Sequence, residues 1–145
     1  MGNKGGCLTK KQLLFHTKKH SGYETDITYI ITPLRTYYLC VVMDLCGRYI
    51  VAYRLGTEIT ATLVSDTVRD TFTREKGKVA NGLVLHSDQG CQYTSEKYFA
   101  LTQEYHFAAS MSRRGYPYDN ALAVLHTNNA CHKTNFIIWI FIVGE

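Results

Sequence analysis

The chain has 145 residues, of which 46% are hydrophobic and 19% charged. This composition is typical of one globular domain and excludes a disordered or membrane-embedded protein. Sixteen Lys and Arg residues against twelve Asp and Glu give a formal net charge of +4, which favours a polyanionic partner without requiring one. Five cysteines form no CxxC pair and follow no secretory leader, so we expect reduced thiols and a cytoplasmic protein without a membrane partner.

The N-terminal residues 1–22 are glycine-rich, then basic, with little apolar periodicity, and we interpret them as a loose basic arm. Alternating β-branched and aromatic residues then predict a first strand from Asp26 to Thr32. A turn at Pro33 leads into an apolar strand over residues 37–43, and a Cys-Gly-Arg turn leads into a third strand over residues 49–55. Three strands joined by short turns predict an antiparallel meander.

Helical and strand patterns alternate after the meander. Residues 60–74 place apolar side chains at helical spacing, and so do residues 95–105, where Tyr98, Phe99, Leu101 and Tyr105 form the expected apolar side. Short strands are expected over residues 82–86 and 107–110. The order βββαβαβ predicts an α/β fold with a mixed five-stranded sheet, helices on both faces, and the fourth strand parallel to the first.

Two aspartates occupy matching places in this sheet. Asp26 lies in the first strand and Asp88 directly follows the fourth, so their side chains converge if these strands are neighbours. Divalent cations such as Mg²⁺ prefer carboxylate oxygens, and a pair of such ions can carry out phosphoryl transfer on nucleic acids. An aspartate at a strand end can also form a turn or cap a helix. Spacing alone leaves both roles open.

Four ordered segments resemble the catalytic core of bacterial insertion-sequence transposases, the branch related to retroviral integrases. They are TDITYI (residues 25–30), VVMDL (41–45), HSDQGCQY (86–93), and the stretch 110–121 that holds SMSRRG and YDNA. The likeness covers residues 23–123. It implies a ribonuclease H-like fold, incomplete here at its C-terminus, a Mg²⁺ or Mn²⁺ cofactor, DNA as substrate, a homo-oligomer or intact transposase as protein partner, and association with the bacterial nucleoid.

The resemblance also implies a catalytic and metal-binding triad of two aspartates and one glutamate. Asp26 and Asp88 match the aspartates, and both the family spacing and the Asp119-Asn120-Ala121 motif place the glutamate at position 124, which is Val124. A valine offers no oxygen to a metal. Asp119 is the nearest acid, and we interpret it as a helix cap.

Residues 124–145 no longer follow the family pattern, and we interpret them as an aberrant tail produced by a truncation, frameshift or insertion in the gene. The apolar run from Phe136 to Val143 has no charge and no proline, so we expect it to be aggregation-prone. It is far shorter than the roughly 20 residues of a membrane helix.

Basic and polar residues near the two aspartates have further possible roles. Arg113, Arg114 and Lys97 are expected to contact DNA phosphates, although an ordinary solvated basic face explains them too. His86 could touch metal or substrate, or be structural, and Asp44 is interpreted as structural.

The sequence predicts a degenerate transposase core, related to enzymes of DNA transposition and integration by metal-dependent phosphoryl transfer. Loss of the glutamate is expected to make it inactive. Three alternatives remain open: activity completed by Asp119 or a partner chain, a non-catalytic remnant that binds DNA or dimerises with intact transposase, and a ribonuclease H-like nuclease.

Overall fold

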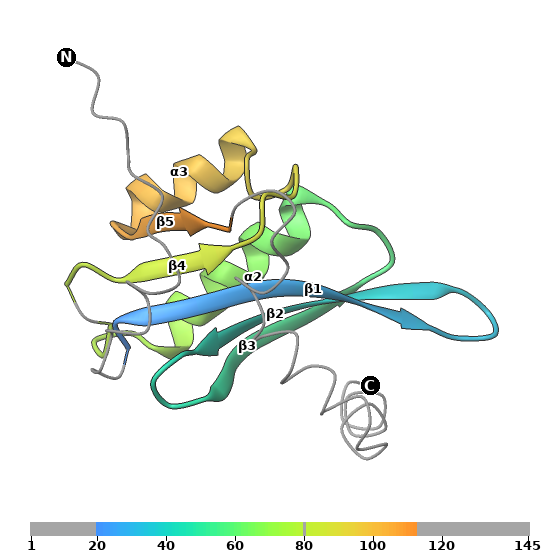
Figure 1. Ribbon diagram of the computed structural model, residues 1–145, viewed down its shortest axis with the longest axis horizontal. Helices are drawn as coiled ribbons and strands as arrows, with labels where there is room; N and C mark the ends of the chain where they lie inside the picture. Colours follow the sequence, from blue (N-terminus) through green and yellow to red (C-terminus); the bar gives the residue numbers. More distant parts are fainter. Residues whose placement is uncertain (1–19, 80, 113–145) are drawn as a thin grey trace.

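The computed structural model describes residues 20–79 and 81–112 (Figure 1). The elements within these residues are β1 (Gly22–Ile31), β2 (Thr36–Asp44), β3 (Tyr49–Gly56), α2 (Ala61–Arg74), β4 (Val84–Ser87), α3 (Glu96–Tyr105) and β5 (Ala108–Met111). Their order, βββαβαβ, is the predicted one. Most of the expected N-terminal arm and the whole tail after Ala123 lie outside the described residues.

The strands form one mixed sheet in the order β3-β2-β1-β4-β5. The first three pair antiparallel, as the short turns between them predicted, whereas β4 pairs parallel with β1 and β5 parallel with β4. The chain between β3 and β4 returns by way of α2, which passes behind the sheet in Figure 1. The predicted five-stranded α/β architecture is therefore confirmed.

Strand β1 begins earlier than its sequence pattern indicated. It starts at Gly22 instead of Asp26, and the Ser21 carbonyl oxygen accepts a hydrogen bond from the Val84 amide (3.0 Å). Residues 22–25 hold Gly and Glu, which are poor strand formers, but they lie between β2 and β4, and pairing on both sides outweighs local propensity. Residues 20–22, expected in the arm, therefore join the core.

Both described helices pack on the same face of the sheet. A single buried cluster contains Val64 and Val68 of α2, Tyr98 and Leu101 of α3, and Cys40 of β2. On α3 the predicted apolar side was wrong at one position: Phe99 is 64% exposed, because Tyr98, Leu101 and Thr102 occupy the turn positions facing the sheet. No helix of the described residues, 20–79 and 81–112, covers the opposite face, so the predicted cover on both faces stays a prediction.

The opposite face of the sheet carries a smaller apolar cluster. Ile30 of β1 and Leu39 and Val41 of β2 are buried there, with Tyr53 packed against them. Asp26 shares this face with Ile30, because side chains alternate along a strand and the two residues are four positions apart. No helix in the described part of the chain is long and apolar enough to cross a membrane.

Asp44, at the end of β2, is a buried carboxylate that holds two separate segments. Its Oδ1 atom accepts hydrogen bonds from the amides of Cys46 (2.8 Å) and Gly47 (2.9 Å), and its Oδ2 atom accepts one from the His20 amide (3.0 Å). The His20 ring lies 2.7 Å from the Glu75 carboxylate, just beyond α2. Asp44 thus joins the β2–β3 turn to the chain entering β1, and its predicted structural role is confirmed.

We expect Asp44→Ala to lower the free energy of unfolding by about 2–3 kcal/mol, because it leaves three amide donors without their charged acceptor. Asp66→Ala is the matched control: its ion pair with Arg54 joins partly exposed groups and contributes about 0.5 kcal/mol or less. Urea unfolding at neutral pH measures both. Equal losses for the two variants would contradict the anchoring role of Asp44.

Candidate functional site

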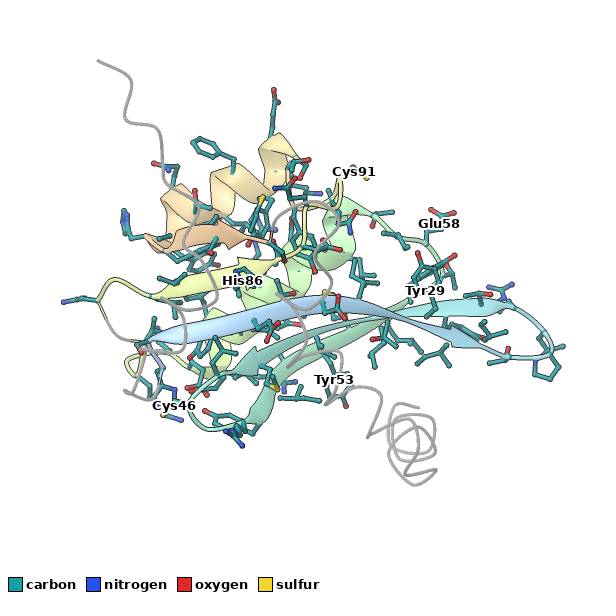
Figure 2. All side chains as sticks on the ribbon, in the orientation of Figure 1. Tyr29, Cys46, Tyr53, Glu58, His86 and Cys91 are labelled. Carbon is teal, nitrogen blue, oxygen red and sulfur yellow. The ribbon has the colours of Figure 1, made fainter. Side chains whose placement is uncertain are left out.

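Asp26 lies in β1, and Asp88 directly follows β4, the parallel neighbour of β1, as predicted. Strands β1 and β4 pair at Gly22↔Val84, Tyr23↔Leu85 and Glu24↔His86. Continuing this register by two residues brings Asp26 opposite Asp88, just beyond the last paired residues. His86 marks the place in Figure 2, on β4 beside β1. Alternation puts Asp26 on the face of the sheet away from α2 and α3.

The charge of Asp88 also acts on the carboxyl group of Asp26. Burial, with a smaller contribution from the Asp88 charge, raises the pKa of Asp26 to about 6, against the opposing effect of a hydrogen bond from the Ile27 amide. A cation between the carboxylates would relieve both the burial cost and the repulsion. The carboxylate oxygens of these two aspartates are therefore suitable ligands for a hard divalent ion.

Asp88 also shapes the loop that follows β4. Its Oδ1 atom accepts a hydrogen bond from the Gly90 amide (2.8 Å), and the Gly90 carbonyl oxygen accepts one from the Tyr93 amide (2.9 Å). The Ser95 hydroxyl then caps α3 by accepting from the Tyr98 amide (3.2 Å). The turn-forming role that the sequence left open is therefore real, and it holds the Asp88 carboxylate at the edge of the sheet.

A buried polar contact beneath this loop was missed from the sequence. The Tyr93 hydroxyl lies 3.2 Å from Thr25 Oγ1, and Thr25 Oγ1 lies 3.9 Å from Cys40 Sγ. Thr25 is the residue before Asp26, and alternation could have shown that it faces the core. Nothing local could have matched it with Tyr93, which is 68 residues away.

His86 is a structural link between β4 and β5. Its ring nitrogens lie 2.9 Å from Ser110 Oγ and 3.4 Å from Ser112 Oγ, and Ser112 Oγ also donates to the Ser87 carbonyl oxygen (3.1 Å). The ring is 2% exposed. These contacts support the structural alternative for His86 over contact with metal or substrate.

The predicted basic residues are only partly described. Lys97, in the first turn of α3, is exposed and donates a hydrogen bond to Thr62 Oγ1 (2.8 Å) in the first turn of α2. Both helices start at the end of the sheet where β4 ends (Figure 1), so Lys97, in the first turn of α3, lies near the end of β4 that Asp88 follows. Arg113, Arg114 and Val124 lie outside the described residues.

The described part of the chain contains no group of three or more His, Cys, Asp or Glu side chains arranged to hold a metal ion. The two aspartates alone make a candidate site for an ion that keeps most of its water ligands. Glu24, two residues before Asp26 on the same face, does not complete such a group.

Sequence comparison finds relatives over most of the chain. The family model described as the integrase core domain matches residues 16–117. The transposase for insertion sequence element IS904 of Lactococcus lactis is 37% identical over 125 residues, which cover 82% of this chain and 48% of that protein. The chain thus spans about half the length of this curated relative.

Two solved structures share the fold. A chain of the simian T-cell lymphotropic virus intasome, in complex with the PP2A regulatory subunit B56 gamma, has a TM-score of 0.68 and 16% identity over 83% of this chain and 41% of its own. The catalytic core domain of HTLV-2 integrase, solved in trimeric form with magnesium, has a TM-score of 0.62 and 18% identity over 79% of this chain and 68% of its own.

The raised pKa of Asp26 predicts a pH-dependent stability. Between an unfolded pKa near 4 and the folded value of about 6, the folded chain binds more protons, so stability falls as pH rises through this range. We expect Asp26→Asn to stabilise the fold by about 1–2 kcal/mol at pH 8 and by much less at pH 4. Urea unfolding at both pH values measures this difference, and an equal effect at the two would contradict it.

Proposed function

Because this chain belongs to the integrase core domain family, we propose that it is the catalytic core of an insertion-sequence transposase that has lost activity. The observation that supports this proposal is that Asp26 of β1 and Asp88, directly after the parallel strand β4, lie close enough for the charge of Asp88 to raise the pKa of Asp26. DNA is the proposed partner, and association with the nucleoid follows from DNA binding. The chain covers 48% of the IS904 transposase, so the activity of a whole transposase is a separate, further part of this proposal.

In this proposal Asp26 and Asp88 are the catalytic acids and hold Mg²⁺ or Mn²⁺, and the similar HTLV-2 core was solved with magnesium. Such an ion, when bound, activates an attacking water or hydroxyl and neutralises charge on the phosphate. Cation binding at Asp26 should depend on pH, because this residue must lose its proton to bind a cation and its pKa is about 6. Asp88 supplies a carboxylate already oriented by its hydrogen bond to the Gly90 amide.

The proposed loss of activity rests on Val124. Family spacing puts the third acid at this position, and valine supplies no ligand. Two carboxylates still attract a divalent ion, but such an ion gains little from two ligands, and a second ion is left unheld. We therefore propose weak metal binding without strand cleavage.

A non-catalytic remnant is the second candidate function. The described core is folded with a continuous buried cluster, so binding to DNA or to an intact transposase does not require the third acid. A related retroviral core was solved as a trimer, which supports a homo-oligomer or a mixed oligomer with intact transposase. The nuclease alternative needs a further acid, and the described residues hold no three-acid group.

A nicking assay tests the catalytic part of the proposal. The purified chain should not cut labelled DNA in Mn²⁺, because one metal ligand is missing at Val124. Val124→Glu should gain detectable nicking, and adding Asp88→Asn to that variant should remove it. Cleavage by the unmodified chain that Asp88→Asn abolishes would reveal a complete site and overturn the claim of inactivity. Nicking that survives Asp88→Asn would show a contaminating nuclease.

A binding titration tests Lys97, one of the three proposed DNA-binding residues, the others being Arg113 and Arg114. Lys97→Ala should weaken binding to any duplex sequence and reduce the slope of log affinity against log salt by about one. Lys76→Ala is the matched control, since Lys76 is an exposed lysine just past the opposite end of α2. Equal effects of the two variants would assign binding to net charge instead of to a contact of Lys97.

A further inference from the structure

We propose that Tyr93 and Thr25 form a bridge that sets the separation of Asp26 and Asp88, which makes both of them positioning residues of the site. The inference rests on the proposed function in one respect, since it takes the two aspartates as the metal-binding pair. The bridge itself is a feature of the core. It is built from a loop that follows one aspartate and a strand residue that precedes the other.

Strand pairing does not extend to the two aspartates. The β1–β4 ladder covers three residue pairs and ends at Glu24↔His86. Asp26 and Asp88 lie two residues beyond this last pair, and Asp88 already belongs to the loop after β4. Their separation must therefore be set by contacts other than the ladder, because a loop without such contacts opens readily.

A continuous series of hydrogen bonds spans this gap. The Gly90 amide donates to Asp88 Oδ1 (2.8 Å), and the Tyr93 amide donates to the Gly90 carbonyl oxygen (2.9 Å). The Tyr93 side chain then reaches under the sheet, where its hydroxyl lies 3.2 Å from Thr25 Oγ1. Thr25 is joined to Asp26 by a peptide bond. Each step of this path is a direct hydrogen bond or a covalent bond.

The bridge is enclosed in the core, so water cannot replace it. Tyr93 is 1% exposed and Thr25 is not exposed at all. The Tyr93 ring packs edge-on against the Tyr98 ring, with centroids 5.5 Å apart. A hydroxyl pair in such surroundings is costly to separate. The bridge also lies on the helix-covered face, opposite Asp26, so it can orient this residue without touching a bound ion.

The charge of Asp26 acts on the Tyr93 hydroxyl of the bridge. Burial is the main cause that raises the pKa of Tyr93 well above its ordinary value, and Asp26 contributes in the same direction. The hydroxyl therefore stays protonated and able to donate. Burial likewise raises the pKa of Tyr98, but Asp26 is not among the causes there. Tyr98 is thus a buried tyrosine in the same core that serves as a control.

The test measures Mn²⁺ binding by isothermal titration, with MnCl₂ as the only ligand, on the full chain. Tyr93→Phe and the nearly isosteric Thr25→Val should weaken binding about tenfold, whereas Tyr98→Phe should leave it within about twofold. Thr25→Ser keeps the hydroxyl and should restore most of the affinity. If Tyr98→Phe weakens binding as much as Tyr93→Phe, or if Thr25→Ser is no better than Thr25→Val, the bridge does not position the site.

Amide hydrogen exchange separates failure of the bridge from failure of the proposed function. Without metal, Tyr93→Phe should speed exchange of the Gly90 amide about fivefold or more relative to Tyr98→Phe, while amides of β2 remain unchanged. If the unmodified chain binds no Mn²⁺ but Gly90 responds in this way, the metal proposal fails and the bridge stands. If Gly90 exchanges equally in both variants, the bridge proposal is overturned whatever the metal result.

Discussion

The parallel pairing of β1 with β4 is the constraint on which the rest of the structure depends. Parallel strands cannot be joined by a tight turn, so the chain must leave β3, cross the sheet and return, and α2 makes that crossover. Burial of Val64 and Val68 against the sheet holds the crossover in place. The same pairing directs residues distant in sequence, Asp26 and Asp88, to one edge of the sheet.

The ionised carboxylate of Asp26 lowers the stability of the fold but favours the binding of a cation. A carboxylate whose pKa is raised by burial disfavours the folded state once it ionises. The fold tolerates the cost because other parts of the core, such as the Asp44 anchor with its three backbone amides, stabilise it. A site that is unfavourable when empty and charged is also one in which a cation gains most.

Much of the fold followed from local pattern. Alternation of β-branched residues, helical spacing and turn residues predicted every described element to within a few residues. The errors fell where tertiary contacts compete with local preference. Residues 22–25 became strand because two neighbours pair with them, and Phe99 turned outward because Tyr98 and Leu101 took the core positions.

Resemblance of the sequence motifs to the family predicts Asp26 and Asp88 as the catalytic pair and Val124 in place of the third acid, and these assignments stay predictions. The contact of Tyr93 with Thr25 and the link of His86 with Ser110 could not be predicted from the sequence. They join residues 68 and 24 positions apart, and many tyrosine or serine hydroxyls could in principle have supplied them. Only the packing of the loop after β4 and of β5 against the sheet selects these pairs, because a buried hydroxyl must find its partner among the groups that the fold encloses with it.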